Sequence, residues 1–419
     1  MSVSSSLELA RLSGAPWLKT PSIERVFAAL ATTGRTSRAV GGAVRNTLLG
    51  QPIDDVDIAT AATPDQVLEA ATRAGLTAIP TGLQHGTVTL VADGVHYEVT
   101  TLRRDMETDG RHATVAFTDD WALDASRRDF TINALYCDAD GTLFDPLGGA
   151  VDLNPTRVRF IGDARARIRE DYLRILRFFR FSARYAEGAI DADGLAACGL
   201  ERAGLAQVSA ERIRVELLKL LSHRRAAEIC RIMQAHGFLV GMLGSAPSPG
   251  RLERLAAIEA ALARKPDPLL RLTALAFYPS GDAGPLARRL RLSGHERRRL
   301  TAISADWAAV EADATVTADR RVIYRRGADG FRDIALIAWA SAAQAPGDPG
   351  WLARIALSEA WPPPRLPLTG QDVMALGIPG GPEVGRALDE LENWWIGHDF
   401  APGRDACLAE LGRRIGLPT

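Results

Sequence analysis

The stretch VGGAVRNTLLGQPIDDVDIAT, which runs from Val40 to Thr60, predicts the start of the fold. Two adjacent glycines, Gly41 and Gly42, follow the apolar end of a strand, and glycine permits a tight turn or a close approach of backbone to a ligand. Residues 43–49 have a helical composition, and Gly50 stands where a glycine that ends a helix is expected. The pattern therefore predicts a strand, a glycine turn and a short helix in succession.

A pair of aspartates closes this stretch. Asp55-Val56-Asp57-Ile58 alternates polar and apolar residues, which is the period of a strand, so Asp55 and Asp57 are expected on one strand face. Two neighbouring carboxylates suit Mg²⁺, which takes one or two carboxylates together with water and substrate phosphates. Upstream, the helix N-terminus after the glycines attracts phosphate, and Arg45 can add a charge-assisted contact. The combination is typical of a nucleotidyl-transfer site, whereas Asp-x-Asp alone is a weak signal that more often marks a solvated turn.

Length and composition restrict the class of protein. A chain of 419 residues is expected to form two to four domains, and its net charge of −1 provides no overall basic field. The four cysteines lie far apart, which argues against a zinc site or a disulfide framework and favours a cytoplasmic location. No signal peptide is found at the N-terminus. The apolar run over residues 334–347 is too short to span a membrane, so no membrane partner is expected.

The element pattern changes along the chain. Up to about residue 150, strand patterns alternate with helical ones, and residues 86–103 and 136–149 are predicted to form hairpins that turn at Ala92-Asp93-Gly94 and Asp140-Gly141. From about Ala164 onward the pattern is helical, with breaks at Gly- and Pro-rich stretches. We therefore expect an α+β fold, with a mixed β-sheet and helices in an N-terminal head, followed by a long all-helical remainder.

Two further motifs carry charge. SRRDFTINAL, residues 126–135, contains an arginine suited to hold a triphosphate, although Arg-Arg-Asp also fits a surface turn. REDYLRILRFFRFSARY, residues 169–185, is predicted to be one helix with Asp171, Arg174, Arg177 and Arg180 at steps of three. Residues 157–184 carry nine arginines against three acidic residues, which favours contact with RNA or a triphosphate. The alternative is an exposed helix whose Asp-Arg pairs contribute about 0.2–0.5 kcal/mol each.

The order of the motifs resembles that of a known family. Gly41-Gly42-x-x-Arg45 with Asp55-x-Asp57, then Arg-Arg-Asp-Phe-Thr-x-Asn at 127–133, then Glu-Asp-x-x-Arg at 170–174 resemble the bacterial class II tRNA nucleotidyltransferase (CCA-adding enzyme) and poly(A) polymerase family. The sequence departs from that pattern at Asn46, where the family usually has Asp, and at Tyr172, where it usually has Pro. The resemblance implies a nucleotidyltransferase head over 20–150, a neck with base-reading and RNA-binding helices over 151–240, a body over 241–360 and a tail over 361–419.

The resemblance also implies the reaction. C, C and A would be added without a template to the 3′ end of tRNA from CTP and ATP, with release of pyrophosphate and with Mg²⁺ held by Asp55 and Asp57. Glu98 is the candidate for a third catalytic carboxylate, and the polar stretch 103–117 resembles the flexible loop of the family. Contacts to the nucleotide are implied for Gly42, Arg45, Arg128, Asp171, Arg174, Arg177 and Arg180.

Base selection follows from hydrogen-bond chemistry. CTP and ATP both present an amine donor beside a ring-nitrogen acceptor, whereas UTP and GTP present a carbonyl beside an N–H group. An acceptor at Asp171 next to a donor at Arg174 complements the first pair and opposes the second. Three alternatives stay open: a poly(A) polymerase of the same family, an enzyme that adds only CC or only A, and a catalytically silent RNA-binding protein on the same fold.

Overall fold

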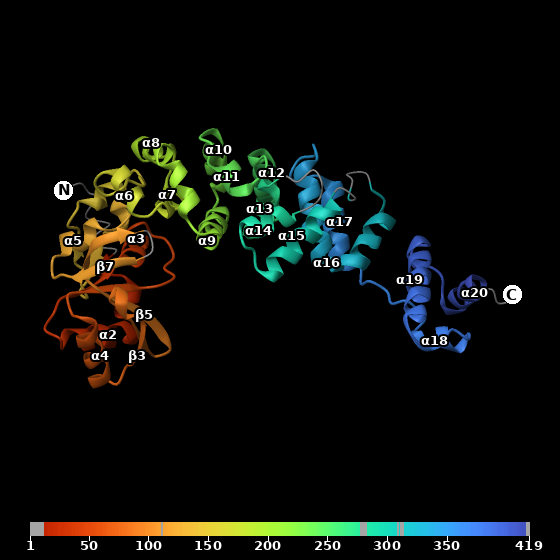
Figure 1. Cartoon of the computed structure of the whole chain (residues 1–419), viewed down its shortest axis with the longest axis horizontal. Helices are drawn as coiled ribbons and strands as arrows, with labels where there is room; N and C mark the ends of the chain where they lie inside the picture. The colour runs from red at the N-terminus through yellow and green to blue at the C-terminus, as the bar shows by residue number, and fades with distance from the viewer. Residues whose placement is uncertain (1–11, 110–111, 277–282, 308–309, 311–313, 416–419) are drawn as a thin grey trace. The chain divides into compact units, whose positions relative to one another are not determined.

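The computed structural model describes residues 12–109, 112–276, 283–307, 310 and 314–415. The chain forms two compact units, Met1–Ile229 and Cys230–Thr419 (Figure 1). The expected finer division at residues 150, 240 and 360 stays a prediction. In the part of the chain that is described, no helix has both the length and the apolar character needed to cross a membrane.

A seven-stranded mixed sheet forms the centre of the N-terminal unit, in the strand order β3-β4-β5-β2-β1-β8-β9. β2 pairs in parallel with β5, and the other neighbouring strands pair antiparallel, so the expected α+β head with a mixed sheet is confirmed. The strands are β1 (Ser37–Val40), β2 (Asp57–Thr60), β3 (Thr77–Gly82), β4 (Thr87–Ala92), β5 (Val95–Thr101), β8 (Tyr136–Cys137) and β9 (Leu143–Phe144).

The two faces of the sheet have different partners. Helices α2 (Pro21–Ala31) and α4 (Pro64–Arg73) pack in one apolar cluster with Ile58 of β2. Ala59, the next residue of β2, belongs to a second cluster that also contains Tyr136. Side chains alternate along a strand, so Asp57 is on the same side as Ala59, opposite α2 and α4.

Local turn chemistry accounts for several elements. Gly41 has φ 71° and ψ −110°, a conformation that favours glycine, and it precedes the expected short helix α3 (Gly42–Leu48). Asp93 and Gly94 both have positive φ, as a two-residue hairpin turn requires, and join β4 to β5. The stretch expected to be a loop forms a two-stranded antiparallel sheet of β6 (Arg103–Asp109) and β7 (His112–Phe117), and residues 110–111 lie outside the described range.

The helix expected over residues 169–185 is interrupted. α6 (Ala164–Glu170) ends before Asp171, whose φ of −155° and ψ of 105° are extended, and α7 (Leu173–Tyr185) begins two residues later. The Asp171 carboxylate accepts a hydrogen bond from the Leu173 N–H at 3.1 Å. An aspartate that bonds to nearby backbone competes with helical hydrogen bonds, so the prediction of one continuous helix is wrong at this joint.

Further helices of the N-terminal unit follow α7. These are α8 (Ala192–Leu200), the 3₁₀ helix η5 (Arg202–Gln207) and α9 (Ala210–Leu221), and α9 packs against α7. Phe130 lies against Phe160 and Phe181, with ring centroids 4.9 and 5.2 Å apart. The contact between Phe130 and Phe181 joins the segment before β8 to α7.

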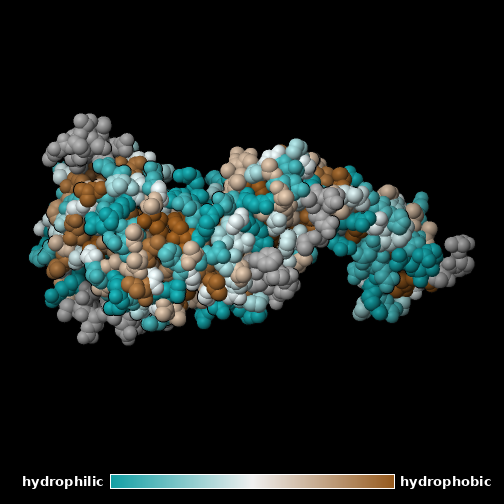
Figure 2. Space-filling model, turned by 90° about the horizontal axis from the view of Figure 1, so that it is seen from above, coloured by the Kyte–Doolittle hydropathy of each residue, from teal (hydrophilic) through white to brown (hydrophobic). Residues whose placement is uncertain are grey.

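The described residues of the C-terminal unit form helices, as expected for the remainder of the chain. Its core is built around α16, where Phe331 is buried and Trp339 stacks on Trp351 with 5.9 Å between ring centroids. In Figure 2 the face shown over α18 to α20 is mostly hydrophilic. The helices are α10 (Ala226–Ala235, across the division), α11 (Leu239–Leu243), α12 (Pro249–Ala261), α13 (Pro268–Leu275), α14 (Gly284–Arg289), α15 (Gly294–Asp306), α16 (Val316–Ser341), α17 (Pro349–Ala360), α18 (Gly370–Ala375), α19 (Pro382–Gly397) and α20 (Arg404–Arg414).

Candidate active site

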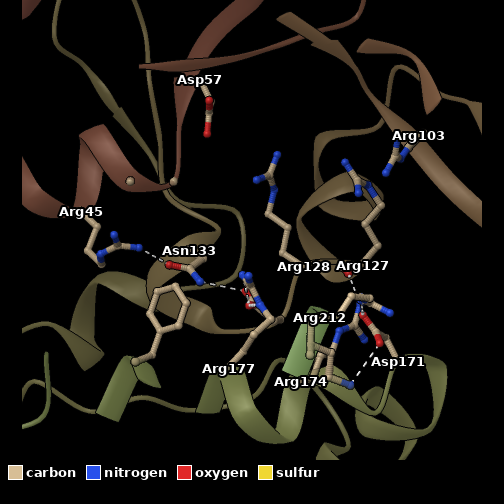
Figure 3. Close-up of a pocket in the computed structure, with 15 residues that line it drawn as sticks. Arg45, Asp57, Arg103, Arg127, Arg128, Asn133, Asp171, Arg174, Arg177 and Arg212 are labelled. Atoms are coloured by element: carbon tan, nitrogen blue, oxygen red, sulfur yellow. Dashed lines mark hydrogen bonds and ion pairs between the residues drawn. The ribbon is translucent and has the colours of Figure 1, made fainter. Parts of the chain in front are cut away.

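A cavity of about 560 Å³ in the N-terminal unit brings the three sequence motifs together (Figure 3). We call it the N-terminal cavity. Seven of its lining residues are arginines, which suits a polyanionic ligand. It is lined by Gly41, Gly42, Arg45, Asp57, Arg103, Arg127, Arg128, Asp129, Asn133, Asp171, Leu173, Arg174, Arg177, Phe181 and Arg212.

Asp57 is the acidic residue that β2 presents to this cavity. The parallel register pairs Ile58 with Val99, so Glu98 lies beside Asp57 on the neighbouring strand. Asp57 is exposed at the cavity, but the protein around it partly displaces water, and the charges of Glu98 and Asp55 add to this effect, so the pKa of Asp57 is raised to about 6. Figure 3 shows Asp57 and Arg128 reaching into the same space, and the Arg128 charge opposes the rise.

The carboxylates of Asp55, Asp57 and Glu98 provide negative charge that suits a divalent cation. A cation bound between these carboxylates would offset the repulsion that adds to the effect of desolvation on the pKa of Asp57. Asp55 lies just before β2, which begins at Asp57, so the expected strand is displaced by two residues. Asp55 and Glu98 are exposed and do not line the N-terminal cavity. Within the ranges that the structure describes, no three Asp, Glu, His or Cys side chains are arranged as a metal-binding group.

Arg45 is held from within the protein. Its side chain is buried, and Nη2 donates to the Tyr185 hydroxyl at 2.6 Å while Nη1 donates to Asn133. Asn46 accepts from both Arg45, at 3.2 Å, and the Tyr185 hydroxyl, at 3.0 Å. Burial lowers the pKa of Arg45. The network leaves Arg45 at the cavity wall with most of its donors already used by the protein.

Asp124 positions both arginines of the Arg-Arg-Asp motif, a role that the motifs did not predict. It is buried in α5 (Trp121–Ser126) and accepts from Arg127 Nε at 2.8 Å and from Arg128 Nη2 at 3.1 Å. Burial alone would raise its pKa, but Arg128 and Arg127 hold the pKa of Asp124 below its usual value. Arg127 and Arg128 follow Asp124 by three and four residues, and side chains at these spacings meet on a helix. This spacing was the signal in the sequence that could have predicted the pairing.

Two more arginines of α7 are paired with carboxylates. Arg177 lines the cavity and donates to Asp129 at 2.7 Å, which outweighs burial and lowers the pKa of Asp129. Arg180 is buried, does not line the cavity and donates to Glu216 of α9 at 2.5 Å. Arg177 and Arg180, expected to act alike, therefore stand in different positions.

Asp171 and Arg174 both line the cavity, and each has a different partner. Asp171 Oδ2 accepts from Arg212 at 2.7 Å, and Arg174 donates to Glu170 at 2.6 Å. No ion pair joins Asp171 to Arg174 in the described part of the chain, so the alternative of a stabilising pair at i,i+3 is not what the structure contains. The partner Arg212 was not predicted, because it lies 41 residues away in sequence.

A second cavity, of about 580 Å³, lies in the C-terminal unit, and we call it the C-terminal cavity. Arg299 is fixed there between Asp333 and Asp267, both at 2.6 Å. Arg264 and Arg298 also line it, and neither has an ion pair with a carboxylate among the described residues.

Comparisons with known proteins identify the family. The poly A polymerase head domain matches residues 37–159, and a probable RNA and SrmB-binding site of polymerase A matches residues 189–246. The mitochondrial CCA tRNA nucleotidyltransferase 1 of Danio rerio is 35% identical over 390 residues, which cover 90% of this chain and 87% of the relative. The chain belongs to the CCA tRNA nucleotidyltransferase family.

Other members agree with this assignment. The CCA-adding enzyme of Limosilactobacillus fermentum is 32% identical over 386 residues, covering 90% of this chain and 92% of the relative. The structure of the Bacillus stearothermophilus CCA-adding enzyme in complex with CTP is similar with a TM-score of 0.74 and 28% identity, over 95% of this chain and 98% of that one. The chain is therefore an enzyme of this nucleotidyltransferase family, which generally uses a divalent metal.

Proposed function

We propose that the N-terminal cavity is where this protein adds C, C and A to the 3′ end of tRNA from CTP and ATP, with release of pyrophosphate. The observation that carries the proposal is that one cavity collects residues from all three motifs, in a chain that matches CCA-adding relatives over nine-tenths of its length. No nucleic-acid template is required, because the protein supplies the groups that select the base.

Asp55 and Asp57 hold Mg²⁺ in this proposal, and Glu98 is the third acidic residue beside them. The raised pKa of Asp57 supports it, because nearby negative charge contributes to that rise and a bound cation would relieve it. Bound Mg²⁺ polarises phosphoryl oxygens and promotes ionisation of the attacking hydroxyl. In the reaction a bond forms between the RNA 3′-oxygen and the α-phosphorus, the bond from that phosphorus to the pyrophosphate oxygen breaks, and the hydroxyl proton is released.

The arginines of the cavity orient the triphosphate. Gly42, Arg45, Arg128 and Arg177 line the cavity and contact the sugar and phosphates in this proposal. Arg180 supports them from behind, because its partner Glu216 also lies 3.9 Å from Arg177. Asp124, which is buried and does not line the cavity, holds Arg128 in place. Bidentate donors held by buried carboxylates lose little rotational freedom when a phosphate binds.

Asp171 and Arg174 read the base edge. The carboxylate of Asp171 accepts from the exocyclic amine of C or A, and the guanidinium of Arg174 donates to the adjacent ring nitrogen. UTP and GTP would leave these groups unpaired, and a site with unpaired polar groups can reject a ligand strongly. Asp171 pairs with Arg212 and Arg174 pairs with Glu170. Asp171 and Arg174 therefore do not neutralise each other, which supports this assignment.

RNA contacts extend over the helical remainder. Arg264 and Arg298 of the C-terminal cavity are cations without carboxylate partners in the described chain, and such cations suit RNA phosphates. A cytoplasmic location is likewise proposed. The mitochondrial relatives make an organelle the other outcome, and fractionation of cells that express the full tagged chain tests this.

One experiment tests the proposed reaction. A tRNA that ends at the discriminator base is incubated with the purified chain and with each triphosphate singly and together, and the added 3′ ends are sequenced. Addition of CCA is the expected result. A long run of A supports a poly(A) polymerase, addition of only CC or only A supports a partial enzyme, and no addition supports a silent RNA-binding protein.

A further inference from the structure

Asp171 lies between two helices, although its proposed role requires its carboxylate to accept a hydrogen bond from the base at a fixed position in the cavity. It is the extended joint between α6 and α7, with φ −155° and ψ 105°. Its N–H donates to the Ile168 C=O at 3.1 Å and its C=O accepts from the Arg174 N–H at 3.0 Å, so the two helices hold its backbone but do not fix its side chain. Its side chain still lines the N-terminal cavity. Hydrogen bonds to a base tolerate only a few tenths of an ångström, so the side chain of Asp171 must be held as well as its backbone.

The first contact is to the carboxylate. Oδ1 accepts from the Leu173 N–H at 3.1 Å, which ties the side chain to the first turn of α7. Oδ2 accepts from Arg212 Nη2 at 2.7 Å, and Arg212 comes from α9, which packs against α7. Each carboxylate oxygen has a second acceptor position, so the carboxylate can keep Arg212 and still accept from a base amine. Arg212 therefore sets the orientation of Asp171 without occupying all of its acceptor capacity.

The second contact is to the next residue, Tyr172. Its ring lies directly on Gly204 of η5, because a Cβ built on Gly204 would come within 2.0 Å of Tyr172 Cδ1 and Cε1. Glu201, the residue just before η5, ties this helix to α6, because it accepts from Arg165 at 2.9 Å and from Arg169 at 2.8 Å. The Tyr172 ring thus connects the joint back to the helix that precedes it.

We propose that Arg212 and Tyr172 are positioning residues for nucleotide selection, which hold Asp171 where the edge of C or A fits. This inference rests on the proposed base-reading role of Asp171. Neither residue is required for the metal chemistry, because Asp57 stands on the sheet and not on this joint. Their loss should therefore change the choice of base more than the rate with a correct nucleotide at saturation.

The first test replaces Arg212 in the full chain. Arg212→Gln is compared with Arg214→Gln, a matched control two residues further along α9 that does not line the cavity. The readout is the ratio of kcat/KM for CTP over UTP on one tRNA. We expect the ratio to fall about tenfold in Arg212→Gln, as for loss of one charged hydrogen bond, and to stay at the wild-type value in Arg214→Gln. An unchanged ratio in Arg212→Gln overturns the role of Arg212.

The second test uses a rescue. Gly204→Ala forces the Tyr172 ring away, and the CTP/UTP ratio should fall severalfold. Tyr172 has φ −62°, the value that proline takes, and Asp171 before it is extended, as a residue before proline must be. Tyr172→Pro in the Gly204→Ala background should therefore fix the joint without the ring and restore the ratio. A Gly204→Ala enzyme with a lowered Tm and an unchanged ratio overturns the role of Tyr172.

Asp171→Ala, measured in the same assay, separates the positioning inference from the proposed base-reading role. If it lowers the ratio and neither the Arg212 nor the Gly204 variant does, the positioning inference fails and the base-reading role stands. If Asp171→Ala itself leaves the ratio unchanged, the base-reading role fails, and the positioning inference fails with it.

Discussion

Two cavities among the described residues are nearly equal in size, 560 and 580 Å³, and both are rich in arginine, yet their charges are organised differently. At the N-terminal cavity, the buried carboxylates of Asp124 and Asp129 hold arginines, and Asp57, Asp129 and Asp171 line the cavity itself. In the C-terminal cavity, Arg299 is fixed by two carboxylates, but Arg264 and Arg298 have no such partner in the described chain. Fixed groups of both signs suit selection of one small ligand, whereas loosely held cations suit a phosphate backbone.

The largest expected effect is at the carboxylates of Asp55 and Asp57. Asp57→Ala or Asp55→Ala should slow nucleotide addition at least about a hundredfold, because several kcal/mol of metal-dependent stabilisation are removed. tRNA affinity and thermal unfolding should change little. Single-turnover addition measures the effect, and Asp54→Ala is the matched control, since that side chain is 75% exposed and lies 3.7 Å from Arg184. Near-normal turnover in either variant would contradict the two-carboxylate assignment.

The next effect is on the choice of base. Asp171→Ala should lower the discrimination of CTP and ATP against UTP and GTP about ten- to a hundredfold, because removal of a hydrogen bond to a charged group costs about 1.5–3 kcal/mol. Competition among all four triphosphates on one tRNA measures this. Asp193→Ala, on an exposed carboxylate outside the N-terminal cavity, should leave discrimination unchanged. Wild-type rejection of UTP and GTP by Asp171→Ala would place base selection elsewhere.

A smaller effect is expected at the C-terminal cavity. The double variant Arg264→Gln, Arg298→Gln should bind tRNA more weakly, and the slope of log affinity against log salt should fall by up to about 2, one for each RNA phosphate that is no longer neutralised. Base discrimination should not change, which would separate the two cavities in function. Salt titration of tRNA binding is the measurement. Arg73→Gln, on an exposed arginine paired with Glu69, is the control, and an equal change in that variant would argue against RNA binding at this cavity.

The smallest effect is a stability change on metal binding. Mg²⁺ at ten times its dissociation constant should stabilise the folded chain by about 1.4 kcal/mol, a rise of a few degrees in Tm that EDTA reverses. Without metal, the raised pKa of Asp57 means that its ionisation destabilises the fold as the pH rises through about 6. The Mg²⁺ effect should therefore shrink below about pH 6 and vanish in Asp57→Asn. An equal Tm rise in that variant would show that Mg²⁺ binds elsewhere.

Much of the fold could be predicted because its signals are local. The Asp93-Gly94 turn, the Gly41 conformation and the short helix after it depend on a few adjacent residues, and the structure contains all three. The error at Asp171 has the opposite cause. A period of three residues describes which side chains a helix would align, but the break depends on the Leu173 N–H, on Arg212 and on Gly204, and the last two lie more than 30 residues away.

The sequence by itself determined the order of motifs, the family and the residue types that can bind a metal, a triphosphate and a base, because these depend on chemistry and short spacings. Only the tertiary structure decided which group each side chain meets. It separated Arg180 from the cavity that Arg177 lines, and it gave Asp171 the partner Arg212 in place of Arg174. Charged side chains are long and have several possible partners, so packing of distant helices, and not local pattern, selects the one that is bound.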